Sequence, residues 1–269
     1  MSTHPHTNLF TQVDRTKDPD FFVRFMDEAQ KPPAIQASKR LMLERIALAP
    51  GAAVLDVGCG PGTDLFDMVA LVGPAGRLVG LDASAVMIAE ARRRAQERQV
   101  PITFEVGEVQ ALPFQDGTFD VCRAARLLEH LPAATRALTE MGRVTRPGGR
   151  ILVWDFDWDT MIIDHPDKET TRTIVRSYCD SIRNGWIGRQ LPRLFKEQHW
   201  EVLSIDPVQV FVHYALAEFF LGSHLAVLQT NGVLSADLAQ QWWEYLQEAD
   251  EHGTLLISFT TFIIVGEKS

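Results

Sequence analysis

The segment at residues 54–62 constrains the fold of this chain more than any other feature of its sequence. A short apolar run, residues 53–57, leads into three glycines at alternate positions, Gly58, Gly60 and Gly62. Glycines in such a loop allow a tight turn and leave bare backbone on which a ligand can lie. Their spacing differs from the Gly-x-Gly-x-x-Gly pattern of dinucleotide sites. We therefore expect a strand, a ligand-binding loop and a helix in that order.

Two acidic residues restrict the ligand of this loop. Asp56 lies two positions before Gly58 and would repel a pyrophosphate, so we expect a ligand that carries a cation near the loop. Asp82 follows Gly62 by twenty residues, at the end of the next expected strand, where a carboxylate can accept hydrogen bonds from both hydroxyls of a ribose. A ligand with a ribose, a positive charge and no phosphate is S-adenosylmethionine. A nicotinamide oxidoreductase is disfavoured by the glycine spacing and by Asp56.

The remaining pattern predicts an α/β fold. Short β-branched runs alternate with helical stretches, which indicates βαβ units, right-handed crossovers and a doubly wound, mostly parallel, seven-stranded Rossmann-like sheet. The expected strands are residues 53–57, 77–81, 102–106, 119–124, 150–155, 201–211 and 255–265, and the expected helical stretches are 63–72, 84–98, 138–144, 168–198 and 215–251.

Two further segments are expected to cover this sheet. Residues 1–48 carry two amphipathic helices and are interpreted as an N-terminal helical lid. Residues 49–269 then form one domain, in which the aromatic-rich block at about 213–252 is interpreted as an inserted helical cap. The alternative is that both segments simply cover the edges of the sheet and close the core.

Composition excludes several classes of function. The net charge of −9 opposes binding to a phosphate backbone, so we expect no nucleic-acid partner. Cys59, Cys122 and Cys179 show no disulfide or Cys-x-x-Cys spacing and are interpreted as reduced thiols. No apolar run is long enough for a membrane span, and the polar N-terminus does not resemble a signal peptide. We therefore expect a soluble cytoplasmic protein.

Several segments together resemble the class I S-adenosylmethionine-dependent methyltransferases. Besides the glycine loop and Asp82, similar segments occur at residues 107–114, 116–120, 126–131 and 143–149. The resemblance covers roughly residues 49–159 and is strongest to the ubiquinone/menaquinone-biosynthesis branch and its small-molecule relatives. It implies the methyltransferase fold, S-adenosyl-L-methionine as cofactor and a small-molecule acceptor. A homodimer is possible, but the sequence does not reveal the oligomeric state.

The resemblance also implies which residues bind the cofactor. Glu108 replaces the family's usual aspartate, so the adenine contact must absorb one extra methylene. Ala125 stands where relatives often carry a polar residue, so one hydrogen bond must come from elsewhere. Met87 is expected to pack near the adenine, with ordinary helix core as the alternative. The full set of cofactor-binding residues is Asp56, Gly58, Gly60, Gly62, Asp82, Ala83, Met87, Glu108, Val109, Ala125 and Arg126.

Three residues are candidates for catalysis. His130 follows the fourth strand, where the chain opens onto the cofactor, so it is a candidate general base with an ionisation near 6.5. The alternative is a partly exposed histidine at a helix start. Asp155 and Asp157 follow at the carboxyl end of the fifth strand, where one carboxylate would face the acceptor. Residues 164–167 contain no second histidine at ligand spacing, so we expect no metal.

The sequence thus predicts a methyltransferase that acts on a small, partly apolar metabolite by O-, N- or C-methylation. One alternative is C-methylation of a quinone ring. Another, of a different class, is a protein that binds S-adenosylmethionine without catalysis. The intact glycine loop and Asp82 argue against that last alternative, because a decayed site would be expected to lose them.

Overall fold

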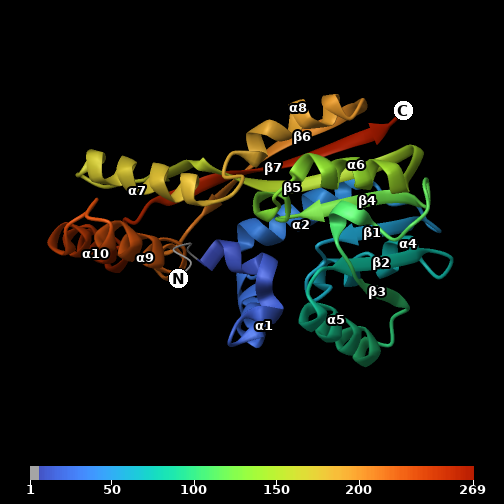
Figure 1. The fold of residues 1–269 in the computed structure, drawn as a ribbon, viewed down its shortest axis with the longest axis horizontal. Helices are drawn as coiled ribbons and strands as arrows, with labels where there is room; N and C mark the ends of the chain where they lie inside the picture. The colour runs from blue at the N-terminus through green and yellow to red at the C-terminus, as the bar shows by residue number, and fades with distance from the viewer. Residues whose placement is uncertain (1–5) are drawn as a thin grey trace.

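A twisted sheet with seven strands runs through the whole molecule (Figure 1). The computed structural model describes residues 6–269, and the sheet order is β3-β2-β1-β4-β5-β7-β6. Strands β1 to β5 are parallel, whereas β7 is antiparallel to both of its neighbours, β5 and β6. The predicted doubly wound, mostly parallel Rossmann-like sheet is confirmed. Its strands are β1 (Ala53–Val57), β2 (Arg77–Asp82), β3 (Ile102–Val106), β4 (Phe119–Ala125), β5 (Thr145–Ile163), β6 (Trp200–Phe211) and β7 (Ile257–Lys268).

Helices cover both faces of the sheet, which explains why the inner strands read as continuous apolar runs. In β1, Val54 packs toward one face and Leu55 toward the other, and both are fully buried. The Val54 face is covered by α2 (Pro33–Ile46), α3 (Thr63–Phe66), α4 (Val69–Val72) and α5 (Ala85–Arg98). The Leu55 face is covered by α6 (Ala134–Val144) and α8 (Ile187–Glu197).

The helix expected over residues 63–72 is divided into α3 and α4. Met68 N donates to Leu65 O at 3.1 Å, and Leu71 N donates to Met68 O at 3.0 Å. These bonds span three residues instead of four, so the chain tightens into 3₁₀-type turns at this point. The local tightening leaves Leu65 and Val72 buried in the same core.

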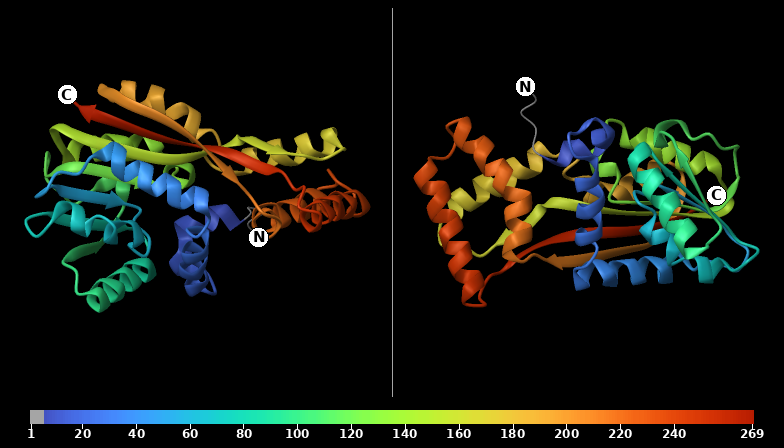
Figure 2. Two further views of the ribbon diagram at one scale, coloured as in Figure 1. Left: turned by 180° about the vertical axis from the view of Figure 1, so that it is seen from behind. Right: turned by 90° about the horizontal axis from the view of Figure 1, so that it is seen from below.

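The remaining helices cluster near the ends of the long strands. α7 (Lys168–Ser181) lies between β5 and β6 in the chain, and α9 (Tyr214–Thr230) and α10 (Ala236–Glu251) lie between β6 and β7. Figure 2 shows these three helices grouped at the far end of β5, β6 and β7, away from the β3 edge. No helix of residues 6–269 is long and apolar enough to cross a membrane.

The N-terminal segment lies across the middle of the molecule. The 3₁₀ segment η1 (His6–Arg15) is followed by α1 (Pro19–Ala29), whose first turn is capped by the Asp18 carboxylate through Phe21 N. Figure 1 shows α1 standing beside the carboxyl ends of the inner strands. Residues 1–5 of the expected lid lie outside the described residues, and the division into 1–48 and 49–269 remains a prediction.

Candidate active site

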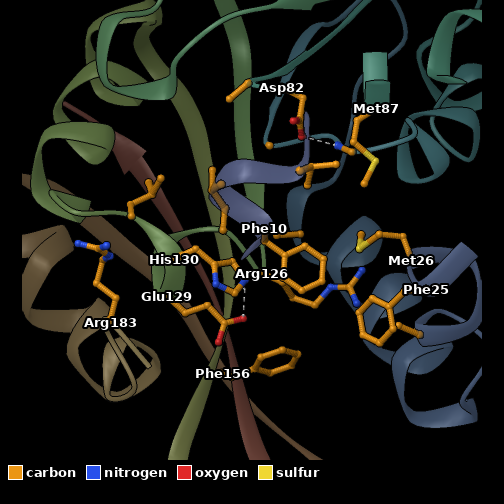
Figure 3. Close-up of a pocket in the computed structure, with 18 of the residues that line it drawn as sticks. Phe10, Phe25, Met26, Asp82, Met87, Arg126, Glu129, His130, Phe156 and Arg183 are labelled. Atoms are coloured by element: carbon orange, nitrogen blue, oxygen red, sulfur yellow. Dashed lines mark hydrogen bonds and ion pairs between the residues drawn. The ribbon is translucent and has the colours of Figure 1, made fainter. Parts of the chain in front are cut away.

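A cavity of about 390 Å³ lies at the carboxyl ends of β1, β2, β4 and β5 (Figure 3). One end is lined by the glycine loop and by the residues that follow β2 and β3. The other end is lined by aromatic side chains from β5, β7, α1 and α9. This position matches the rule that open α/β sheets bind ligands beyond the carboxyl ends of their strands. We call the two ends the loop half and the aromatic half.

Asp82 is held rigidly in the loop half. Its Oδ2 accepts from Gly60 N at 2.8 Å, and its Oδ1 accepts from Ser84 N at 2.9 Å. A carboxylate has about four acceptor sites, so two remain for the hydroxyls of a ribose. Burial raises the pKa of Asp82 and outweighs these two hydrogen bonds, which lower it.

Gly60 leaves space where the ligand is expected. Its φ of +52° is in the left-handed region, and an added Cβ would meet no atom nearer than Met26 Cε at 3.7 Å. The backbone therefore faces open cavity at this residue. Together with Asp82 and with the exposed Glu108 carboxylate at the cavity wall, this cradle fits a ribose and an adenine.

Nine of the predicted cofactor residues line the cavity and two do not. Gly62 (φ +77°) packs at the base of the loop, where an added Cβ would lie 2.7 Å from the Phe104 ring. Asp56 is 3 % exposed and lies beneath the loop, with its Oδ2 3.5 Å from Arg123 Nη1. The structure therefore does not bring Asp56 to the ligand side of the loop. The nine lining residues are Gly58, Gly60, Asp82, Ala83, Met87, Glu108, Val109, Ala125 and Arg126.

A buried charge network supports the loop from below. Arg123 Nη2 lies 2.7 Å from Asp64 Oδ2, and Lys39 Nζ lies 2.7 Å from Asp64 Oδ1. Burial alone would raise the pKa of Asp64, but attraction by Arg123 and Lys39 outweighs it and lowers that pKa strongly. Burial raises the pKa of Asp56 to about 7. The network joins α2 and β4 to the helix that follows the glycine loop.

The N-terminal segment contacts both halves of the cavity. The Asp14 carboxylate accepts from Ala85 N at 2.8 Å and from the Ser84 hydroxyl, at the start of α5. Phe10 stacks on the His130 ring with centroids 5.3 Å apart. Phe10 and Val13 of this segment therefore form part of the cavity wall.

His130 lies on the cavity wall, as the sequence predicts, but in an unexpected electrostatic state. Its side chain is 13 % exposed, and its Nε2 lies 3.5 Å from Glu129 Oε1. Burial, reinforced by the nearby positive charge of Arg126, lowers the pKa of His130 to about 4. The ionisation expected near 6.5 is therefore moved out of the neutral range, and the burial that causes this shift could not be read from the sequence.

Glu129 is a second ionisable group at this wall, and the sequence analysis overlooked it. The residue is 2 % exposed and accepts a hydrogen bond from the Trp158 indole Nε1. Burial raises its pKa to about 7, although Trp158 and Arg126 act in the opposite direction. Its position next to His130, in the segment 126–131 that resembles the methyltransferases, is the sequence feature that could have identified it. In Figure 3 the two side chains point together into the cavity.

Asp155 and Asp157 are not brought to the cavity. Asp155 is completely buried, and its carboxylate accepts from Leu128 N at 2.8 Å. Asp157 accepts from Arg189 Nη2 at 2.7 Å. Successive side chains of a strand point to opposite faces, so Phe156 and Trp158 line the cavity while the two aspartates face away. Asp155 thus supports the loop that carries Glu129 and His130 instead of meeting an acceptor.

Comparison with known proteins agrees with this site. A family model described as a methyltransferase domain matches residues 48–203. A protein of Streptomyces fradiae described as an uncharacterized 37.1 kDa protein in transposon TN4556 is 36 % identical over 275 residues, covering 99 % of this chain and 76 % of that one. The demethylmenaquinone methyltransferase of Lactococcus lactis is 28 % identical over 202 residues, covering 72 % of this chain and 77 % of that enzyme.

Solved structures show the same fold. A putative methyltransferase from Bacillus halodurans superposes with a TM-score of 0.63 at 15 % identity, covering 86 % of this chain and 99 % of that one. The chain belongs to the methyltransferase domain family. It is an S-adenosylmethionine-dependent small-molecule methyltransferase that resembles the quinone-biosynthesis branch, so the predicted cofactor and class of enzyme are confirmed.

Proposed function

We propose that the acceptor is a small, largely apolar metabolite that contains a ring, methylated at an atom next to Glu129 and His130. The observation that carries this proposal is the composition of the aromatic half of the cavity. Its walls are aromatic side chains that offer a flat apolar surface on which a ring can stack. The Glu129–His130 pair is the polar part of the wall beside these rings. These rings are Phe25, Phe156, Trp158, Phe219, Phe220 and Phe259.

The chain's own residues then have three tasks. Asp82 and the backbone at Gly60 hold the cofactor, whose sulfonium supplies an electrophilic methyl group when bound. The aromatic walls exclude water and align the acceptor atom with the methyl group. Glu129, with its pKa near 7, accepts the proton of an acceptor hydroxyl, amine or acidic carbon. Neutral His130 orients that group through a ring nitrogen.

Quinone-ring C-methylation is the second candidate. The Lactococcus lactis relative is named a demethylmenaquinone methyltransferase, and a Bdellovibrio bacteriovorus relative named a ubiquinone/menaquinone biosynthesis C-methyltransferase is 39 % identical over 106 residues. A reduced quinone ring also fits flat aromatic walls. The two candidates differ in the methylated atom of the product. Mass-spectrometric fragmentation distinguishes a methyl group on oxygen or nitrogen from one on a ring carbon.

We also propose that the protein acts in the cytoplasm, without a nucleic-acid partner, and that it can form a homodimer. Support for the compartment comes from the three cysteines, which are all unpaired and buried. Support for the absence of a nucleic-acid partner comes from the net charge of −9, and support for a small acceptor comes from the cavity volume of about 390 Å³.

A transfer assay tests the proposal. The protein is incubated with S-adenosylmethionine carrying a deuterated methyl group and with phenols, quinols, aromatic acids and acyclic amines of similar size. We expect label in ring-containing acceptors, and none with the Asp82→Ala variant. Transfer confined to acyclic polar acceptors would contradict the proposal.

A further inference from the structure

Arg126 is directed into the cavity by an unusual backbone conformation. It follows β4 with a φ of +56°, in the left-handed region that a residue with a Cβ adopts at a cost of about 1 kcal/mol or more. Its backbone N donates to Trp154 O at 2.6 Å, which holds this turn in place. Figure 3 shows the side chain crossing the cavity toward Phe25, opposite His130 and Glu129.

The guanidinium of Arg126 forms no ion pair with the described side chains, although the Asp64, Glu129 and Asp155 carboxylates attract it from beyond ion-pair distance. No carboxylate oxygen of these side chains lies within 4.0 Å of it, and its Nε is buried without a hydrogen-bond partner. Its Cζ lies over the Trp154 ring, 5.2 Å from the ring centroid. Arg123, three residues earlier, is by contrast paired with both Asp56 and Asp64. Burial lowers the pKa of Arg126 and outweighs the attraction of these three carboxylates.

A single unpaired arginine selects for one kind of ligand group. The planar guanidinium matches a carboxylate with two parallel hydrogen bonds, and one cation balances one monoanion. A phosphate dianion would need a second cation, and Arg183, which also borders the cavity, is exposed and points away from its centre (Figure 3).

We infer that Arg126 is a carboxylate-binding residue of this cavity. The carboxylate has two sources, because Arg126 lies between the two halves of the cavity: the amino-acid part of the cofactor, or a ring acceptor that bears a carboxylate. The second source rests on the proposed function, whereas the first does not.

Calorimetry with two cofactor products distinguishes the first source. S-adenosylhomocysteine carries the carboxylate, and 5′-methylthioadenosine has the same nucleoside without the amino acid. If Arg126 binds the cofactor, Arg126→Met and Arg126→Gln weaken S-adenosylhomocysteine binding at least about tenfold, the loss expected for a charged hydrogen bond, and leave methylthioadenosine binding unchanged. Arg126→Lys, which keeps the charge without the planar fork, recovers part of the affinity.

The second source is tested on the complex with S-adenosylhomocysteine, using 2-naphthoate and 2-naphthamide as probes. If Arg126 binds the acceptor, Arg126→Met weakens naphthoate binding at least about tenfold, leaves naphthamide unchanged and leaves S-adenosylhomocysteine unchanged. Arg176→Met, an exposed change on α7 outside the cavity lining, is the control and should alter neither naphthoate nor S-adenosylhomocysteine binding.

The inference is overturned if Arg126→Met changes neither S-adenosylhomocysteine nor naphthoate binding. It is also overturned if methylthioadenosine binding is lost together with S-adenosylhomocysteine binding, because Arg126 would then hold the site's structure. Failure of all ring compounds to bind would contradict the proposed acceptor class and leave the cofactor arm intact.

Discussion

Asp82 is the side chain on which cofactor binding depends most directly. Both of its oxygens already accept one backbone N–H, so their orientation toward the cavity is fixed before the ligand arrives. We expect Asp82→Ala to weaken S-adenosylhomocysteine binding by about 2 kcal/mol or more, because each hydrogen bond to a charged group contributes about 1.5–3 kcal/mol. Titration calorimetry measures this. Asp180→Ala, an exposed change on α7, is the control, and unchanged affinity in Asp82→Ala would refute the assignment.

The pH dependence of turnover identifies the base. Only the ionised Glu129 carboxylate accepts a proton, and burial raises its pKa to about 7, so kcat should fall as the pH falls through about 7. His130, whose pKa is about 4, remains neutral throughout that range and contributes no ionisation to it. The measurement is kcat against pH with saturating acceptor.

Variants at the same wall separate the two residues. Glu129→Gln should abolish this ionisation and lower kcat about 100-fold or more, the usual effect of a lost general base. His130→Ala should keep the midpoint near 7, since Glu129 remains. A wild-type pH profile in Glu129→Gln would mean that another group takes the proton, or that alignment alone suffices.

At the scale of single elements, the glycine loop can be tested with a matched pair of glycines. Gly60 and Gly51 both have positive φ, +52° and +84°, and neither has an atom nearer than 3.7 Å to an added Cβ. Valine at either position costs about 1–2 kcal/mol of stability through backbone strain. Gly60→Val alone should abolish S-adenosylhomocysteine binding, because Gly60 lines the cavity. Equal affinities of the two variants, with circular dichroism unchanged, would show that the loop is misassigned.

The buried network beneath the loop predicts a large stability effect. Arg123→Met leaves the Asp64 and Asp56 carboxylates without this cation, and removing one partner of a buried ion pair costs about 3–5 kcal/mol. Arg193→Met removes an exposed pair with Glu197 and should cost less than about 1 kcal/mol. Urea unfolding compares the two, and similar midpoints would contradict a structural role for the network.

Strand β5 shows what sequence reasoning could not reach. The expected strand ended at residue 155, but β5 continues to Ile163 because it pairs with β7 over that length. The sequence shows that aspartates and aromatic residues alternate along this strand. It does not show which of the two sets faces the cavity. On the other face, Asp157 pairs with Arg189, which lies on α8 and is distant in the sequence.

The cofactor-binding loop, in contrast, could be predicted because its residues are close in the sequence. The glycine loop and Asp82 lie within one βαβ unit, so their spacing along the chain already determines their proximity. The state of Glu129 depends on burial by several separate segments, among them the strand that carries Trp158. The spacing of residues along the chain does not predict burial by segments that are distant in the sequence.

At the scale of the whole molecule, three regions enclose the cavity. Phe25 on α1 stacks on Phe219 on α9 with centroids 4.4 Å apart, so the N-terminal segment contacts α9 directly. Arg94 on α5 pairs with Asp27 on α1 at 2.8 Å and holds the segment from the other side. These contacts support an acceptor that is bound away from water, between the sheet on one side and α1 and α9 on the other.

A crystal structure of the complex with S-adenosylhomocysteine tests the account most directly. It should show the ribose hydroxyls on the Asp82 carboxylate and the nucleoside against Gly60, with the sulfur facing the half of the cavity that contains Glu129, His130 and Phe156. A ribose bound away from Asp82, or a sulfur facing away from those three side chains, would contradict the account.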